Sequence, residues 1–138
     1  MTAMARTGSS GSGPAPLRSL AATLLAGALY DFLFAVTLVA APRLLQSTLS
    51  LPLPGEPFYL RAIAALLFLA GGFYWITARD PAARRAYVAM AVAGRTAGFV
   101  ALALSAYGRS DLAGLWIPAG ADLLFALAHA ATARPLWR

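Results

Sequence analysis

Three charged side chains interrupt long apolar stretches of the sequence and are the first candidates for chemistry. Asp31, Arg95 and Asp122 each lie near the middle of a block of otherwise mostly apolar residues. A charged residue that faces lipid costs about 2.5–3.5 kcal/mol on an insertion scale. We therefore expect these side chains to face inward in a helical bundle, with at least one Asp carboxylate paired to the Arg95 guanidinium.

Two further side chains are predicted to join this polar core. Arg61 lies one turn into the second apolar block and can reach the surface, bond Glu56, or point at an Asp. In the last case two Asp and two Arg would make the interior neutral. Tyr30 precedes Asp31 and can donate a hydrogen bond to it or to Arg95.

The last apolar block also contains His129, a further candidate for the polar core. It follows Asp122 by seven residues, which places it on the same helical face and about 10 Å further along the helix. Pro118 and Gly120 precede Asp122 and loosen the backbone there. A buried histidine is more often a hydrogen-bonded structural residue than a proton carrier, and both interpretations stay open.

The charged set has two main interpretations. In the first, the ion pairs only specify the register and orientation of the helices. In the second, they line a polar pocket that binds a ligand or relays protons, because ionisable residues inside a membrane are functional candidates by default. A third interpretation is that one of the charges meets a partner subunit.

The elements that position these residues follow from composition. Of 138 residues, 60% are hydrophobic and 12% charged, whereas soluble domains have about 45–50% apolar and about 25% charged residues. Each apolar block is close to the roughly 20 residues that cross a bilayer, and short connections make neighbours antiparallel. The sequence predicts an all-α polytopic membrane protein, an up-down four-helix bundle, with transmembrane helices at about 20–41, 58–78, 86–107 and 112–133.

The connecting segments are predicted from proline and glycine. Residues 42–57 hold four prolines and Gly55, which predicts an irregular segment at the membrane interface. Pro118 is expected to interrupt the fourth helix. Residues 1–16 are rich in Gly, Ser, Pro and Ala and are expected to form a disordered cytoplasmic tail before a transmembrane domain at 17–138. The first block is too long for a signal-peptide core and contains Asp31.

The distribution of arginine predicts the orientation. All eleven basic residues are Arg, and translocation of basic loops is disfavoured. The larger group would lie on the side of the termini and comprises Arg6, Arg18, Arg79, Arg84, Arg85, Arg134 and Arg138; the smaller comprises Arg43, Arg61 and Arg109. This predicts a multi-pass protein of the bacterial inner membrane with both termini in the cytoplasm. Aromatic residues are expected at the interfaces: Phe58, Tyr59, Tyr74, Trp75, Tyr87, Tyr107, Trp116 and Trp137.

The sequence argues against several classes of function. It has no Cys and one His, which excludes disulfides, thiolate metal sites and bis-histidine haem. No metal site, cofactor or catalytic residue is predicted, since no enzyme motif is present. The arginines mark helix ends and do not predict nucleic-acid binding. The expected partners are the bilayer and either another membrane protein or further copies of the chain.

A GxxxG spacing in the third block predicts close helix packing. Gly94 and Gly98 are separated by three residues, a pattern that lets two helices approach closely. Packing within the bundle is the first expectation, and a homodimer face is the alternative.

One segment resembles a known family. In YLRAIAALLFLAGGFYW, residues 59–75, Arg61 enters an Ala- and Leu-rich helix that closes on Gly71 and Gly72. This segment resembles the DoxX-like group of small bacterial four-helix membrane proteins, and residues 17–134 fit its helix number and size. The resemblance implies a bundle that acts at times as an accessory partner of membrane oxidoreductases, and it supplies no catalytic residue. The small multidrug resistance transporters have an acid where Asp31 lies, but a central Arg95 departs from their pattern.

The predicted function is therefore a class of protein. We expect a non-enzymatic accessory or small-ligand-binding subunit with Asp31, Arg95 and Asp122 as its buried polar core. The alternative is a small oligomeric proton-coupled transporter with Asp122 and His129 on the proton path. An enzyme that acts on a lipid-soluble substrate through the two acids is a third hypothesis.

Overall fold

The computed structural model describes residues 15–138, which are helical and contain no strand. The predicted all-α fold is confirmed for this part of the chain, whereas most of the predicted tail lies outside the described residues. The four long helices are α1 (Ala15–Ala40), α3 (Pro57–Arg79), α4 (Arg85–Ala106) and α5 (Trp116–Ala133). The shorter elements are α2 (Pro42–Leu49), η1 (Ser110–Leu115) and η2 (Arg134–Leu136).

Four helical segments are long and apolar enough to cross a membrane: Leu17–Ala40, Pro57–Arg79, Arg85–Ala106 and Ser110–Leu136. The predicted second and third helices agree with α3 and α4 to within a residue. The first helix begins at Ala15, five residues before the expected Leu20. Pro16 is compatible with this start, because the backbone N–H groups of the first helical turn form no helical hydrogen bond and proline lacks that group.

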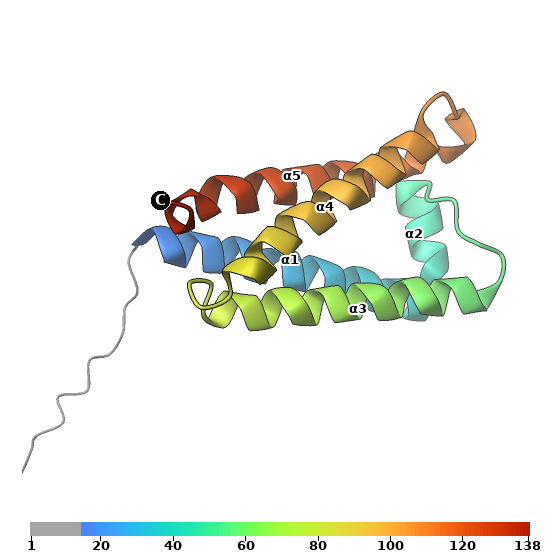
Figure 1. Cartoon of the computed structure of the whole chain (residues 1–138). Coiled ribbons are helices and arrows are strands. Elements are labelled where there is room, and N and C mark those ends of the chain that lie inside the picture. Colours follow the sequence, from blue (N-terminus) through green and yellow to red (C-terminus); the bar gives the residue numbers. More distant parts are fainter. Residues whose placement is uncertain (1–14) are drawn as a thin grey trace, which may run out of the picture.

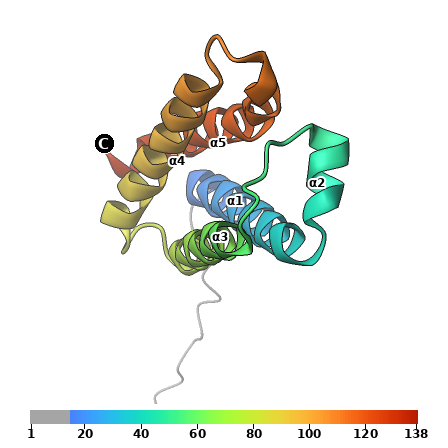
Figure 2. The same ribbon diagram turned by 90° about the vertical axis from the view of Figure 1, so that its right-hand side faces the viewer.

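The long helices associate as two pairs. Helix α1 packs along α3, and α4 packs along α5, while α1 also contacts α5 and so joins the pairs (Figure 1). Helices α3 and α4 make few contacts because they diverge after the short turn that connects them. Figure 2 shows the two pairs end-on, with α2 and the segment that follows it beside the space between them.

Helix α2 contradicts the expectation of an irregular segment over residues 42–57. Pro42 occupies the first turn, where proline is well tolerated, and the next seven residues contain neither Gly nor Pro. The helix therefore forms and runs to Leu49. Ser50, the residue that follows, has a left-handed backbone conformation with φ 50°. The prolines at 52, 54 and 57 do keep the rest of the segment irregular up to the start of α3.

Pro118 does not interrupt the fourth long helix as expected. The chain turns at Gly108, which has a φ of +69°, and then forms the 3-10 helix η1. Helix α5 begins at Trp116, so Pro118 lies in its first turn, where its missing N–H breaks no helical hydrogen bond.

Candidate functional site

The structure brings the three central charges together in one buried cluster. Arg95 of α4 donates from Nη2 to Asp31 Oδ1 of α1 at 2.8 Å and from Nη1 to Asp122 Oδ1 of α5 at 2.6 Å. Nη2 also donates to the carbonyl oxygen of Gly27 at 3.2 Å. The predicted pairing is thus present, and one guanidinium joins helices α1, α4 and α5.

Aromatic rings cover the Arg95 guanidinium. Its Cζ lies 4.9 Å from the centre of the Tyr74 ring, 5.0 Å from Phe125 and 5.6 Å from Tyr30. Such cation–π contacts are worth about 2 kcal/mol or more when desolvated. Together with the two carboxylates, these rings leave Arg95 only 4% exposed.

Tyr74 and Phe125 are the parts of the site that the sequence analysis missed. Tyr74 was expected at the membrane interface, but its ring faces inward against Arg95 and is 9% exposed. Phe125 follows Asp122 by three residues and so shares its helical face. That spacing is a signal in the sequence, whereas nothing in it indicated Tyr74.

Tyr30 contacts the cluster through its ring, and Arg61 lies at the surface, which was one of the three alternatives considered for it. Tyr30 meets Arg95 through the face of its ring, and its ring also packs against Phe34 and Phe125. Arg61 lies on the exposed side of α3, beside a shallow groove lined by Ala35, Ala64 and other small or apolar residues. The cluster therefore contains two carboxyl groups and one guanidinium, and the alternative in which Arg61 points at an Asp is wrong.

His129 lies next to the cluster and is completely buried. Its Nδ1 donates a hydrogen bond to the carbonyl oxygen of Phe125, one turn back on α5. The ring packs against those of Tyr74 and Phe125, with centroids 5.8 and 5.9 Å apart. An added Cβ on Gly27 would lie 3.4 Å from both the His129 ring and Arg95 Nη2, so these two side chains share the surface of Gly27.

Three buried polar atoms of Asp31, Arg95 and His129 have no hydrogen-bond partner among the described residues. They are Asp31 Oδ2, Arg95 Nε and His129 Nε2. An unsatisfied buried polar group is costly, and native structures satisfy the great majority of them. All three atoms belong to the same buried cluster as the two ion pairs.

Gly98 allows α5 to approach α4 at the cluster. A Cβ at this position would overlap the carboxylate of Asp122, so a side chain here would displace that group. Gly94, the other member of the GxxxG pattern, would contact only the hydroxyl of Tyr74. Gly98 thus packs within the bundle, which was the first expectation for this motif.

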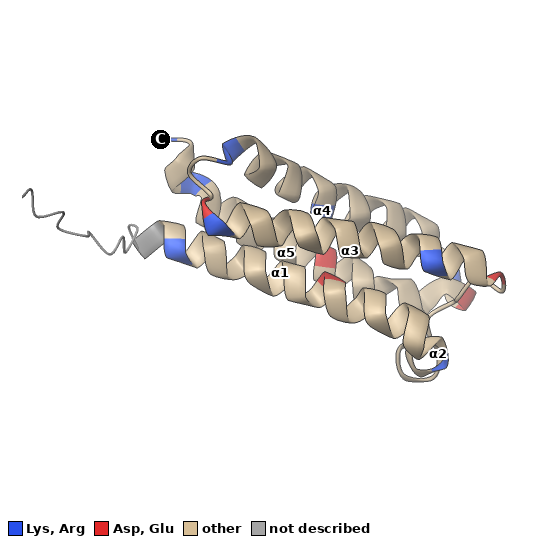
Figure 3. Cartoon of the chain, turned by 90° about the horizontal axis from the view of Figure 1, so that it is seen from below, with Lys and Arg blue, Asp and Glu red and all other residues tan. Residues whose placement is uncertain are grey.

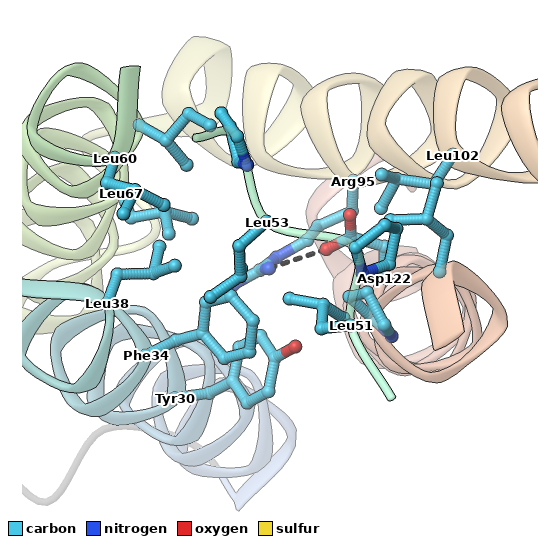
Figure 4. Close-up of a pocket in the computed structure, with 15 residues that line it drawn as sticks. Tyr30, Phe34, Leu38, Leu51, Leu53, Leu60, Leu67, Arg95, Leu102 and Asp122 are labelled. Atoms are coloured by element: carbon cyan, nitrogen blue, oxygen red, sulfur yellow. Dashed lines mark hydrogen bonds and ion pairs between the residues drawn. The ribbon is translucent and has the colours of Figure 1, made fainter. Parts of the chain in front are cut away.

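A cavity of about 190 Å³ leads to the cluster. Figure 4 shows apolar side chains from several elements around it, with Arg95 and Asp122 at one side joined by their ion pair. The other lining residues are Tyr30, Phe34, Leu38, Leu51, Pro52, Leu53, Pro54, Leu60, Ile63, Leu67, Leu102, Leu115 and Pro118. The wall is thus almost entirely apolar with a single charged region, which is the pattern of small-molecule sites.

The segment after α2 forms one wall of this cavity and is held by a close backbone contact. Residues 51–54 line the cavity, and Leu51 is buried. A Cβ on Gly114 of η1 would overlap the carbonyl groups of Leu49 and Ser50. Glycine at 114 therefore lets η1 and the end of α2 close this side of the cavity.

The other carboxylate–arginine pair of the described residues is exposed. Arg109 Nη2 donates to Asp111 Oδ2 at 2.7 Å, and both side chains are more than half exposed. The hydrogen bond to Asp111 and the negative charge of that carboxylate raise the pKa of Arg109. Most charged residues gather at the two ends of the bundle (Figure 3). Acidic positions also lie midway along the helices in the same view.

No known protein family, curated protein sequence or solved structure matches this chain. Within the described residues, no group of three His, Asp or Glu side chains is placed to hold a metal ion. What the site can do is therefore argued from its own residues.

Proposed function

We propose that this chain is an integral membrane protein, a non-enzymatic accessory or ligand-binding subunit that takes a small lipid-soluble molecule into the cavity beside Arg95 and Asp122. The proposal rests on the cavity itself, whose wall is apolar except where it borders the buried charged cluster. A cluster that served only to join helices would not require an open space beside it.

The outer surface of the long helices supports a place in the bilayer. Each presents large exposed apolar side chains, such as Leu29 on α1, Leu66 on α3, Leu104 on α4 and Leu124 on α5. In water, apolar patches of this extent mark interaction surfaces or aggregation. Lipid is the solvent that would accept them on every side of the molecule.

The proposed topology is an up-down bundle in the bacterial inner membrane with both termini in the cytoplasm. Two observations support it: the C-terminus lies beside the beginning of α1 (Figure 1), and most arginines lie at that end. Reporter fusions after residue 82 should be active only in the cytoplasm, and a periplasmic signal there would refute the orientation. Kinship with the DoxX-like group stays a prediction.

Ligand binding can be tested with a small neutral probe. We expect benzyl alcohol to bind the purified full-length chain in detergent, detected by saturation-transfer NMR. Leu102→Trp should abolish binding because Leu102 lines the cavity. Leu104→Trp is the matched control, since Leu104 lies two residues away on the same helix and is 72% exposed. Equal binding by both variants would show that the probe dissolves in the micelle and does not occupy the cavity.

A proton-coupled transporter is the second candidate, and the unpartnered atoms favour it. Asp31 Oδ2 and His129 Nε2 are buried without hydrogen-bond partners, so each could accept a proton. A transporter would show pH-dependent flux of a bound probe in vesicles, and the flux would be lost in His129→Phe. A binding subunit would bind the probe without such flux.

A further inference from the structure

We propose that the ligand of this cavity is a small apolar monocation, such as a protonated amine, whose charge pairs with Asp122. This inference rests on the proposed binding function and specifies its ligand class. It follows from the charge balance of the cluster, from the group that faces the cavity, and from the walls.

The cluster contains more acidic than basic groups. Two carboxylates, of Asp31 and Asp122, share the single guanidinium of Arg95. In the tautomer that donates from Nδ1 to Phe125, His129 is neutral and adds no positive charge. Burying a net charge in a medium of low dielectric is unfavourable, so a bound cation would stabilise the set.

Both Arg95 and Asp122 line the cavity, and Asp122 is the more exposed of the two. Arg95 is 4% exposed, both its Nη atoms donate to the protein, and its faces are covered by rings. Asp31 is 1% exposed and does not line the cavity. Asp122 does line the cavity, and its side chain is 17% exposed. The carboxylate is thus the charged group with more surface left for a ligand, and it favours a cation over an anion.

The walls suit a small apolar cation. Tyr30 and Phe34 contribute aromatic rings to the wall, and one face of the Tyr30 ring already meets Arg95. A ring face that stays open attracts cations. The other wall residues offer apolar side chains to the body of the ligand. The volume of about 190 Å³ is below the roughly 300–1,000 Å³ of sites for drug-sized molecules, which restricts the ligand to about one ring or a short chain.

Three probes of similar shape test the charge preference: benzylamine, which is protonated at neutral pH, benzyl alcohol and benzoate. We expect benzylamine to bind the full-length chain at least about tenfold more tightly than benzyl alcohol, a factor that corresponds to about 1.4 kcal/mol. Benzoate should bind most weakly. Leu102→Trp should remove binding of the first two probes, which assigns them to the cavity.

Asp31→Asn separates the charge argument from simple contact with the ligand. Asp31 does not touch the cavity, and the amide can still accept the hydrogen bond from Arg95, but the excess negative charge is gone. Affinity for benzylamine should fall to about that for benzyl alcohol, whose own binding should not change. Asp122→Asn should also lower the affinity for benzylamine, because it removes the carboxylate that faces the ligand. Asp111→Asn is the control, because that acid is exposed and lies at the turn before α5.

The outcomes distinguish the two levels of the proposal. If benzyl alcohol binds the cavity and benzylamine binds no more tightly, the cation inference is wrong and the binding function stands. Tighter binding of benzoate, or unchanged benzylamine affinity in both Asn variants that still bind benzyl alcohol, would also overturn the inference. If no probe binds in a manner sensitive to Leu102→Trp, both proposals fail.

Discussion

The two ends of the bundle differ in how they are filled. At the end that holds the start of α1 and the C-terminus, Leu20, Leu24, Val88 and Leu136 are almost completely buried in one continuous apolar cluster. At the end near α2, a smaller buried cluster lies next to the cavity. The charged cluster lies between these regions, closed off on one side and reachable on the other.

The connections between the helices explain this difference. Helices α3 and α4 are joined by a short turn, in which the Ala83 amide donates to Asp80 Oδ1 at 3.0 Å, so the helices are held close there. At the other end they diverge, and α2 with residues 50–56 occupies part of the space. A loop rich in proline fills such a space less completely than a packed helix, which leaves room for a ligand.

The largest loss of stability is expected from changes in the charged cluster, which lies between the two ends of the bundle. Arg95→Leu strands two buried acids, and breaking a buried pair costs about 3–5 kcal/mol. We expect a large loss of folded protein, measured by thermal unfolding in detergent. The triple change of Asp31, Arg95 and Asp122 to Leu should recover much of the stability, because replacing all members with apolar residues is often neutral.

The same triple variant separates the structural from the functional interpretation of the cluster. If the charges serve binding, it should be folded and should no longer prefer benzylamine over benzyl alcohol. A folded triple variant with the probe preferences of the original chain would end the functional interpretation. Wild-type stability of Arg95→Leu alone would show that the ion pairs do not matter for folding.

Truncation of one leucine at each end compares their packing directly. Leu24→Ala removes a completely buried side chain from the packed end and should cost about 2–5 kcal/mol. Leu102→Ala removes a side chain that already borders empty space, so it should cost clearly less. The midpoints of thermal unfolding of the two variants give the comparison. Equal losses would mean that the cavity end is as tightly packed as the other.

A smaller effect is expected where η1 meets the end of α2. Gly114→Ala places a Cβ against the carbonyls of Leu49 and Ser50, and such overpacking costs about 1–3 kcal/mol. The wall formed by residues 51–54 should move outward, which faster hydrogen exchange of the Leu51 and Leu53 amides would report. Gly120→Ala is the control, since its Cβ would meet open space. Unchanged exchange in Gly114→Ala would contradict this account of how the cavity is closed.

The smallest effect is expected at Ser50, at the border of the cavity end. Its φ of 50° is in the left-handed region, which glycine adopts without steric cost. Ser50→Gly should therefore raise the free energy of unfolding by less than about 1 kcal/mol and leave probe binding unchanged. A loss of stability would mean that the Ser50 side chain contributes more than its backbone strain costs.

Several features of this protein followed from local sequence alone. The apolar blocks predicted the four long helices, and α3 and α4 agree to within a residue, because apolar length and flanking charges are local properties. The same reasoning placed Asp31, Arg95 and Asp122 in contact, since isolated charges in apolar helices must find partners. The seven-residue step to His129 likewise put it on the face of Asp122, and it is buried there.

Only the tertiary structure decided how these elements meet. Proline content predicted an irregular segment where α2 forms, because proline breaks a helix in its interior but is tolerated in its first turn. The inward turn of Tyr74 and the exposure of Arg61, which leaves two acids with one arginine, depend on the rotation of α3 about its axis. A nearly uniform apolar helix does not specify that rotation. The cavity arises from the divergence of α3 and α4, which depends on packing between residues far apart in the chain.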